Sequence, residues 1–172
     1  MTRQRASKQD DKWKEIRRNR PVETVKWVPP THDRWCRCEI DSNGKSCVAG
    51  CELKQQRREC KGCLNGNACV NNVIQRAPDS FRGCEKIDCG DRGYGLAFTE
   101  DVPENVIAME YTGEIISEST ARRRLELNEG KPTYACEIVK GWVLDGRRMG
   151  SHARFINSSH DPNSVLETWW VG

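Results

Sequence analysis

The chain of 172 residues is 36% hydrophobic and 31% charged, with a formal net charge of +3. This length accommodates one ordinary domain with a small appendage, and it excludes two large cores. No apolar run approaches the ~18 residues needed to cross a bilayer, so we do not expect this chain to be a membrane protein.

The chain begins with a basic lead-in. Residues 1–35 contain ten Lys and Arg against five Asp and Glu, a local excess of +5, while the remainder is slightly acidic. We predict a basic N-terminal arm over residues 1–30 that contacts nucleic-acid phosphates, with a merely solvated arm as the alternative. Residues 1–11 lack the apolar core of a secretory signal, which predicts a reducing compartment.

A cysteine-rich segment follows over residues 31–80. Seven thiols fall within 34 residues, namely Cys36, Cys38, Cys47, Cys51, Cys60, Cys63 and Cys69. Glycines between them let short loops fold back, and thiolates at such spacings match the tetrahedral sulfur site that Zn²⁺ prefers. A disulfide framework is the alternative, but it would require secretion. The segment therefore predicts structural zinc.

Two tetrahedral zinc ions need eight ligand positions, and seven cysteines supply eight if one thiolate bridges. Cys47 is central in the order and is the predicted bridge. The first ion is assigned to Cys36, Cys38, Cys47 and Cys51. The second is assigned to Cys47, Cys60, Cys63 and Cys69. His32, Cys84 or Cys89 could instead supply a separate eighth ligand. A DNA-binding zinc cluster would place a basic helix beside the thiols, whereas here the basic residues precede them.

The last zone, residues 81–172, has the pattern of short strands. Runs rich in aromatic and β-branched residues, bounded by Gly, Pro, Asp or Asn, predict strands at residues 94–98, 106–111, 114–116 and 134–139. Lys140-Gly141 predicts a hairpin to residues 142–144. Cys136, on one of these strands, is expected to be an ordinary buried thiol. We expect a mostly β fold with few helices.

One surface helix is predicted between these strands. Ser117 is its expected N-cap, and Glu118 favours its positive N-terminal end. Ala121, Leu125 and Asn128 are expected to share a face. Gly130 and Pro132 are expected to stop the helix.

Three motifs occur in order through this zone. They are Arg92-Gly93-Tyr94-Gly95, Glu110-Tyr111-Thr112-Gly113-Glu114, and the run from Arg154-Phe155-Ile156-Asn157-Ser158 to Asn163. Together they resemble the SET domain of protein lysine methyltransferases. The cysteine segment is similar to the AWS zinc segment that precedes the SET domain in the Ash1-like, histone H3 lysine-36 class. The resemblance covers residues 36–172 and implies a SET fold preceded by a two-zinc AWS segment.

This resemblance implies a nuclear, chromosome-bound transferase that methylates a histone lysine, with S-adenosylmethionine as methyl donor and the H3 tail of nucleosomes as partner. By position, the cofactor would be held by Arg92, Gly93, Tyr94, Tyr134, Asn157 and Ser158. Tyr111 would line the channel for the substrate lysine and is the implied catalytic residue. The two zinc ions would be structural.

Two departures from the family pattern stand out. Ser158 replaces a usual histidine, and His160 replaces a cysteine that in the family joins a third zinc site. The sequence also stops at Gly172, before the family's final strand, tyrosine motif and post-SET segment, so we expect an incomplete SET domain. A catalytically inactive chromatin-binding scaffold that retains the zinc clusters is therefore the alternative function.

Overall fold

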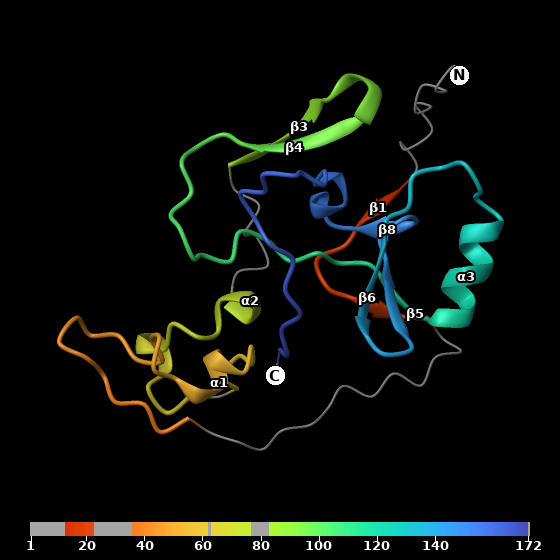
Figure 1. Cartoon of the computed structure of the whole chain (residues 1–172). Coiled ribbons are helices and arrows are strands. Elements are labelled where there is room, and N and C mark those ends of the chain that lie inside the picture. The colour runs from red at the N-terminus through yellow and green to blue at the C-terminus, as the bar shows by residue number, and fades with distance from the viewer. Residues whose placement is uncertain (1–12, 23–35, 62, 77–82, 172) are drawn as a thin grey trace. The chain divides into compact units, whose positions relative to one another are not determined.

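The computed structural model describes four stretches of the chain: residues 13–22, 36–61, 63–76 and 83–171. They divide into two compact units (Figure 1). The first unit contains described residues 13–22 and 83–162, and the second contains 36–61, 63–76 and 163–171. Among the described residues, no helix is both long and apolar enough to span a membrane.

A four-stranded sheet forms the centre of the first unit. Its strand order is β2 (Arg20–Pro21), β5 (Glu114–Ser117), β7 (Trp142–Asp145) and β6 (Ala135–Val139). β2 runs parallel to β5, and the other neighbours are antiparallel. Apolar side chains of β5 and β7 are buried, namely Ile115, Ile116, Val143 and Leu144. This burial explains why these two strands occupy the middle of the sheet.

Two smaller sheets complete this unit. β3 (Cys84–Asp88) pairs antiparallel with β4 (Tyr94–Phe98), and the 3-10 turn Gly90–Arg92 connects them. β1 (Lys14–Glu15) runs parallel to β8 (Met149–Gly150). The mostly β fold class and the strand over 94–98 are confirmed. β3 was not predicted, because its Cys-Glu-Lys-Ile-Asp sequence contains few strand-favouring side chains.

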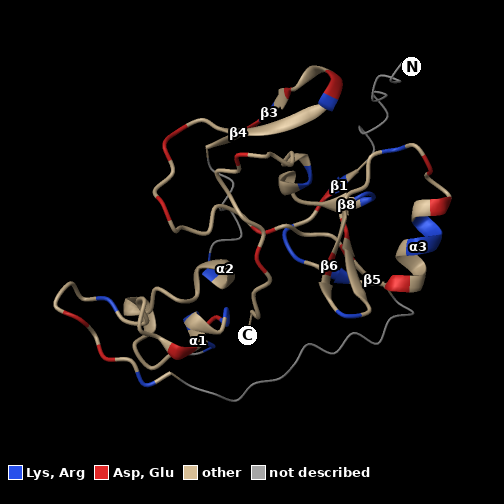
Figure 2. Cartoon of the chain, in the orientation of Figure 1, with Lys and Arg blue, Asp and Glu red and all other residues tan. Residues whose placement is uncertain are grey.

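The predicted helix is α3 (Glu118–Glu126), which starts as expected. The Ser117 hydroxyl accepts a hydrogen bond from the Thr120 amide at 3.3 Å, which caps its N-terminus. Charges of both signs line α3 (Figure 2). Leu125, on the face predicted to be shared with Ala121 and Asn128, is 55% exposed. Arg124 points inward instead, because buried carboxylates on the sheet bind it.

The strand predicted at residues 106–111 is also wrong. This stretch has no strand assignment, and its C-terminal end continues as an irregular turn to β5. Its composition favoured a strand, but side chains from other elements bind its backbone. For example, the Ser151 hydroxyl donates to the Glu110 carbonyl at 2.7 Å. Side-chain partners satisfy these backbone groups where a neighbouring strand would otherwise do so.

Part of the predicted basic arm lies in the first unit. Residues 13–22 supply β1 and β2, and Ile16 is only 6% exposed. The rest of the arm, residues 1–12 and 23–30, lies outside the described residues. The described part of the arm therefore pairs with strands β8 and β5 of the first unit.

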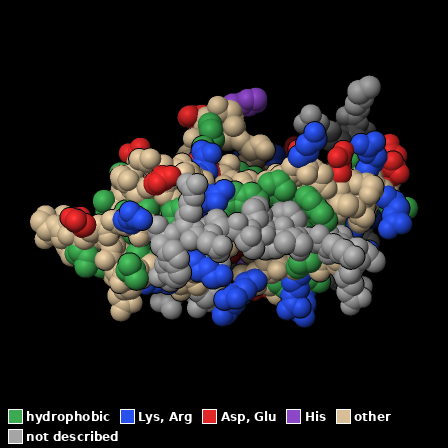
Figure 3. Space-filling model, turned by 90° about the horizontal axis from the view of Figure 1, so that it is seen from below, with side chains coloured by type: hydrophobic (Ala, Val, Ile, Leu, Met, Phe, Trp, Pro, Cys, Tyr) green, Lys and Arg blue, Asp and Glu red, His purple; other side chains and the backbone are tan. Residues whose placement is uncertain are grey.

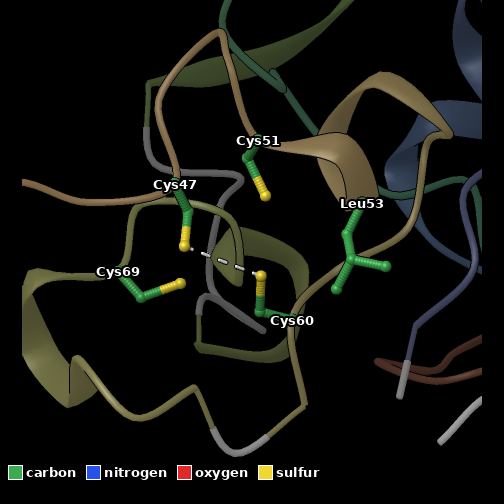
Figure 4. Close-up of a cluster of buried hydrophobic side chains, with 5 residues drawn as sticks. All are labelled: Cys47, Cys51, Leu53, Cys60 and Cys69. Carbon is green, nitrogen blue, oxygen red and sulfur yellow. Dashed lines mark hydrogen bonds between the residues drawn. The ribbon is translucent and has the colours of Figure 1, made fainter. Parts of the chain in front are cut away.

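The second unit is held by sulfur. Its helices are short: α1 (Glu52–Gln55), α2 (Val73–Arg76) and the 3-10 turn Gly66–Ala68. Its buried cluster consists of Cys47, Cys51, Leu53, Cys60 and Cys69 (Figure 4). Among the described residues of this cluster, Leu53 is the single aliphatic side chain. So small an apolar core cannot stabilise the unit by itself.

Residues 163–171 join this second unit through main-chain contacts. Trp170 forms a parallel bridge with Arg58, and its amide donates to the Arg57 carbonyl at 2.9 Å. Its carbonyl accepts from the Glu59 amide at 2.9 Å. Arg57 also forms a salt bridge with Glu167 at 2.9 Å. The C-terminal residues therefore extend the cysteine-rich unit.

A buried carboxylate organises α2 in the same unit. Glu59 is 1% exposed, and its carboxylate accepts hydrogen bonds from the Ile74 and Gln75 amides at the start of α2. A negative group at this position binds amides that the helix leaves without intrahelical partners. Glu59 thereby fixes α2 on the segment that follows α1.

Candidate functional site

The sulfur atoms of the second unit converge. Cys36 lies 3.2 Å from Cys47 and 3.5 Å from Cys63, and Cys47 lies 3.8 Å from Cys60 (Figure 4 draws the last contact). All ten cysteines are free thiols. Close unbonded sulfurs in a mostly buried cluster are the donor set of a zinc thiolate site.

Two groups of four cysteines could each hold a metal ion, because all the sulfurs within a group lie within 4.8 Å of one another. The first group is Cys36, Cys38, Cys47 and Cys51, which coincides with the ligand set assigned to the first ion. The second is Cys36, Cys47, Cys60 and Cys63. Cys36 and Cys47 each belong to both groups, and the bridging role of Cys47 stays a prediction. The assignment of Cys69 to the second ion stays a prediction, and Cys69 lies buried in the same cluster.

Burial changes the acidity of these thiols. It raises the pKa of Cys47, Cys60 and Cys63, and it raises the pKa of Cys38 to about 11. Burial also acts to raise the pKa of Cys36, but hydrogen bonds from Cys47, the Cys38 backbone and Cys63 outweigh it and lower that pKa to about 7. Several thiolates this close repel one another without a cation. The donor set therefore fits Zn²⁺, which would displace the thiol protons.

Other candidate ligands lie elsewhere. Cys84 and Cys89 belong to the first unit, and among the described residues neither group of converging sulfurs includes them. His32 lies outside the described residues. Cys136 is half-buried on β6, and burial raises the pKa of its thiol.

The glycine loop of the first unit lies against the last motif. Gly93 has φ +73°, a conformation that favours glycine, and it leads into β4 at Tyr94. The Asn157 amide donates to the Tyr94 carbonyl at 3.2 Å across 63 positions of sequence. A Cβ on Gly95 would lie 2.5 Å from the Cys89 sulfur and 3.2 Å from the Asn157 side-chain nitrogen. Only glycine permits this close approach.

A tyrosine pair forms the second part of the site. The Tyr111 hydroxyl donates to the Tyr134 carbonyl at 2.8 Å, and the Tyr111 ring packs against Gly146. Burial, helped by the nearby Cys136, raises the pKa of the Tyr111 phenol. Tyr111 is therefore a neutral hydroxyl in the physiological pH range, where it can orient a substrate group without acting as a base.

Cations and aromatic rings connect the two parts. The Arg154 guanidinium lies 4.0 Å from the Tyr134 ring centroid and 5.3 Å from that of Phe155. Phe155 packs edge-on against Tyr94 at 6.2 Å, and the Lys86 ammonium lies 3.5 Å from the Tyr94 centroid. These ring faces accept positive charge. Lys86 and Arg154 supply that charge here, and they connect the glycine loop to Tyr134.

The predicted residues thus divide into two sets. Gly93, Tyr94 and Asn157 lie together, and Tyr111 lies with Tyr134. Arg92, Asn157 and Ser158 are exposed. The structure adds Lys86, which sequence reasoning missed. Lys86 sits on the unpredicted strand β3, and no sequence signal linked it to the aromatic cluster.

A buried ion triad supports the sheet beneath this site. Arg124 of α3 contacts Glu114 and Asp145, each at 2.7 Å, and the three side chains are 5–14% exposed. Burial acts to lower the pKa of Arg124, but its hydrogen bonds to Glu114 and Asp145 outweigh burial and raise it. The triad ties α3 to β5 and β7, the strands that follow Tyr111 and precede Gly146.

Comparison with known proteins gives one family match. Residues 93–171 match the family model described as the SET domain. The chain is 33% identical over 144 residues to "Histone-lysine N-methyltransferase ash1" of Drosophila melanogaster, which covers 79% of this chain and 6% of that protein. It is 34% identical over 115 residues to "Histone-lysine N-methyltransferase, H3 lysine-36 specific" of Candida albicans, covering 65% and 13% respectively.

A solved structure shows the same fold. The polycomb repressive complex 2 of Chaetomium thermophilum contains a chain that superposes with a TM-score of 0.66 at 27% identity, over 78% of this chain and 20% of that one. The first two curated relatives are much longer, since the chain spans 6% and 13% of their lengths.

Proposed function

Residues 93–171 belong to the SET-domain family, and from this premise we propose that the chain transfers a methyl group from S-adenosylmethionine to a lysine of a histone. One observation carries the proposal. The first and third motifs meet where Asn157 binds the Tyr94 backbone. The second joins them through Tyr134, whose carbonyl accepts from Tyr111 and whose ring lies 4.0 Å from the Arg154 guanidinium.

S-adenosylmethionine supplies an electrophilic methyl group on a sulfonium. Gly93, Tyr94 and Asn157 would hold it, with Arg92 and Ser158 at the exposed rim and Tyr134 beside it. The proposal is supported by the contact between Asn157 and the Tyr94 carbonyl, which brings two of these residues together.

The lysine amine must lose its proton before it attacks. With an ordinary pKa of ~10.4, this costs roughly 4–5 kcal/mol at neutral pH. The nitrogen then forms a bond to the methyl carbon as the carbon–sulfur bond breaks, and the electron pair stays on the departing thioether. The neutral Tyr111 hydroxyl would orient the amine, and half-buried aromatic walls would exclude water. Such alignment contributes up to about 7–11 kcal/mol.

The seven cysteines would hold two structural Zn²⁺ ions, with Cys47 as the bridge. The convergence of the sulfurs supports this part of the proposal. Metal binding would supply the folding free energy that the second unit's small apolar cluster does not.

The substrate would be lysine 36 of the histone H3 tail in nucleosomes, and the chain would act in the nucleus on chromosomes. The printed name of the Candida albicans relative supports this choice of lysine. Lys and Arg side chains are spread among carboxylates in the view of Figure 3. The basic N-terminal residues would contact nucleosomal DNA.

The test is methyl transfer to recombinant nucleosomes, read by mass spectrometry of the H3 tail. We expect methyl incorporation at lysine 36 for the wild type, and a fall of at least about tenfold in Tyr111→Phe, which loses the hydroxyl. Leu64→Ala, an exposed change in the second unit, is the matched control.

The outcome also separates the two candidate functions. Binding of S-adenosylmethionine by calorimetry without methyl transfer, in this chain and in one extended beyond Gly172, would replace the enzyme with a scaffold. No binding of the cosubstrate would remove the proposed site altogether.

A further inference from the structure

Residues 110–113, the turn that carries Tyr111, lead into β5 without strand assignment. The Gly113 carbonyl accepts a hydrogen bond from the Arg20 amide of β2 at 3.0 Å. Ser151 binds the turn from one side: its hydroxyl donates to the Glu110 carbonyl at 2.7 Å and accepts from the Thr112 amide at 3.2 Å. Thr112 is only 1% exposed, so its polar groups need partners inside the protein.

The other partners come from residues 13–22. The Gly113 amide donates to the Asn19 side-chain oxygen at 3.0 Å, and the Thr112 hydroxyl donates to the Ile16 carbonyl at 2.8 Å. The Asn19 side-chain nitrogen donates to the Glu110 carboxylate at 3.5 Å. Asn19 therefore contacts both ends of the turn, on either side of Tyr111.

We propose that Asn19 is a positioning residue for the reaction, which holds the turn of residues 110–113 so that Tyr111 stays aligned with Tyr134. This rests on the proposed function, because the alignment matters for methyl transfer only if Tyr111 lines the lysine channel. Asn19 acts on Tyr111 through its hydrogen bonds to the Gly113 amide and the Glu110 carboxylate, the residues on either side of the turn.

The surroundings of the turn explain why a small shift would matter. A Cβ on Gly113 would lie 2.7 Å from the Asp145 carbonyl, so the turn passes tightly over the end of β7. The neighbouring Gly146 packs against the Tyr111 hydroxyl, and its amide donates to the Tyr134 carbonyl at 2.9 Å. Movement of Gly113 is therefore transmitted to the phenol and its partner.

Asparagine suits this position because it offers one acceptor and one donor on a short side chain. Asn19→Asp keeps an oxygen for the Gly113 amide, but it loses the donor and places a second carboxylate against Glu110. Asn19→Ala removes both hydrogen bonds. The two variants therefore form a graded series, and Arg18→Ala is the matched control, since Arg18 is exposed.

The experiment uses the full chain labelled with 3-fluorotyrosine and observed by fluorine NMR. The chain has three tyrosines, so three signals can be assigned by single Tyr→Phe variants. We expect Asn19→Ala to shift and broaden the Tyr111 signal while the Tyr94 signal stays in place. Asn19→Asp should give a smaller shift in the same signal, and Arg18→Ala no shift. An unchanged Tyr111 signal in folded Asn19→Ala overturns the proposal.

Kinetics on nucleosomes give the second readout. We expect kcat to fall about tenfold in Asn19→Ala, with the KM for S-adenosylmethionine unchanged. A misplaced Tyr111 would stabilise the transition state less well but would leave cosubstrate binding unaffected. If the wild type methylates and Asn19→Ala retains full kcat, the positioning role is wrong. If the wild type transfers no methyl while the Tyr111 signal moves as expected, the proposed function fails and the structural role of Asn19 stands.

Should Asn19→Ala fail to fold, Asn19→Asp decides the question. Its side chain has nearly the same shape, and the same two readouts apply. If that variant shows neither a shifted Tyr111 signal nor a lowered kcat, the proposal is overturned.

Discussion

The two units of this protein are stabilised in different ways. In the first, apolar side chains of β5 and β7 are buried in a paired sheet, and Arg124 closes a buried ion triad above it. In the second, four of the five residues in the buried cluster are cysteines. One unit is therefore specified by short consecutive apolar runs buried in a sheet, and the other by the spacing of cysteines that could hold metal. Removal of bound metal should affect the two units differently.

Chelation of zinc should give the largest effect. Structural zinc contributes about 10–16 kcal/mol in small zinc modules, so we predict that a strong chelator unfolds the second unit while β5 and β7 stay folded. Hydrogen exchange should show lost protection in residues 36–76 and also in residues 163–171, which pair with the same unit. Restored protection after zinc addition is the control. Unchanged protection over residues 36–76 would break the contrast.

Arg124→Met should strike the first unit instead. It leaves Glu114 and Asp145 as buried carboxylates without their cation, which costs about 3–5 kcal/mol. We predict a lowered midpoint of urea unfolding followed on β5 and β7, with zinc content unchanged. Arg122→Met, at an exposed salt bridge of the same helix, is the matched control and should cost less than about 0.5 kcal/mol. Equal effects of the two changes would contradict a buried triad.

Ser117→Ala is a milder probe of the same unit. It removes the hydroxyl that caps α3, and loss of such a cap costs about 1 kcal/mol. Amide exchange should accelerate in the first turn of α3 and leave residues 36–76 unaffected. Ser119→Ala, two residues further along the chain, provides the comparison. A similar loss of stability in that variant would argue against the cap.

Glu167→Gln should give the smallest effect, and it lies in the second unit. Hydrogen bonds from Trp169 and then Arg57 lower the pKa of Glu167. A carboxyl with a lowered folded pKa contributes stability above its unfolded pKa, and this contribution is lost as pH falls through the folded value. The side chain is 34% exposed, so solvent screening limits the effect to at most about 0.5 kcal/mol. Denaturant titrations should show a lower free energy of unfolding for Glu167→Gln than for the wild type at neutral pH, and equal values at acid pH.

The sequence predicted the fold class, the hairpin around Gly141 and the cap at Ser117, because each depends on neighbouring residues. It did not predict β1 and β2, which are two residues long and exist through distant partners. It misassigned residues 106–111, since the groups that bind the adjoining turn are the Ile16 carbonyl and the Asn19 and Ser151 side chains. The residue pattern of a short segment does not identify partners that are distant in sequence.

The sequence predicted part of the candidate site, as it predicted part of the fold. Motif order indicated Tyr94, Tyr111, Tyr134 and Asn157, and the structure brings them together in two contacting pairs. Cysteine spacing indicated the sulfur cluster, although the second group of converging sulfurs contains Cys36 in the place assigned to Cys69. Asn19 and Lys86 were missed, because only the folded chain places them beside these tyrosines.

Native mass spectrometry of the purified chain, with S-adenosylmethionine added, tests the metal-held unit and the cosubstrate site in one spectrum. We predict two zinc ions on each folded chain and one further mass increment for bound S-adenosylmethionine. A folded chain without zinc, with its mass lowered by the hydrogens lost to disulfides, would contradict the sulfur-held unit. A zinc-loaded chain that takes up no S-adenosylmethionine would contradict the site built around Tyr94 and Asn157.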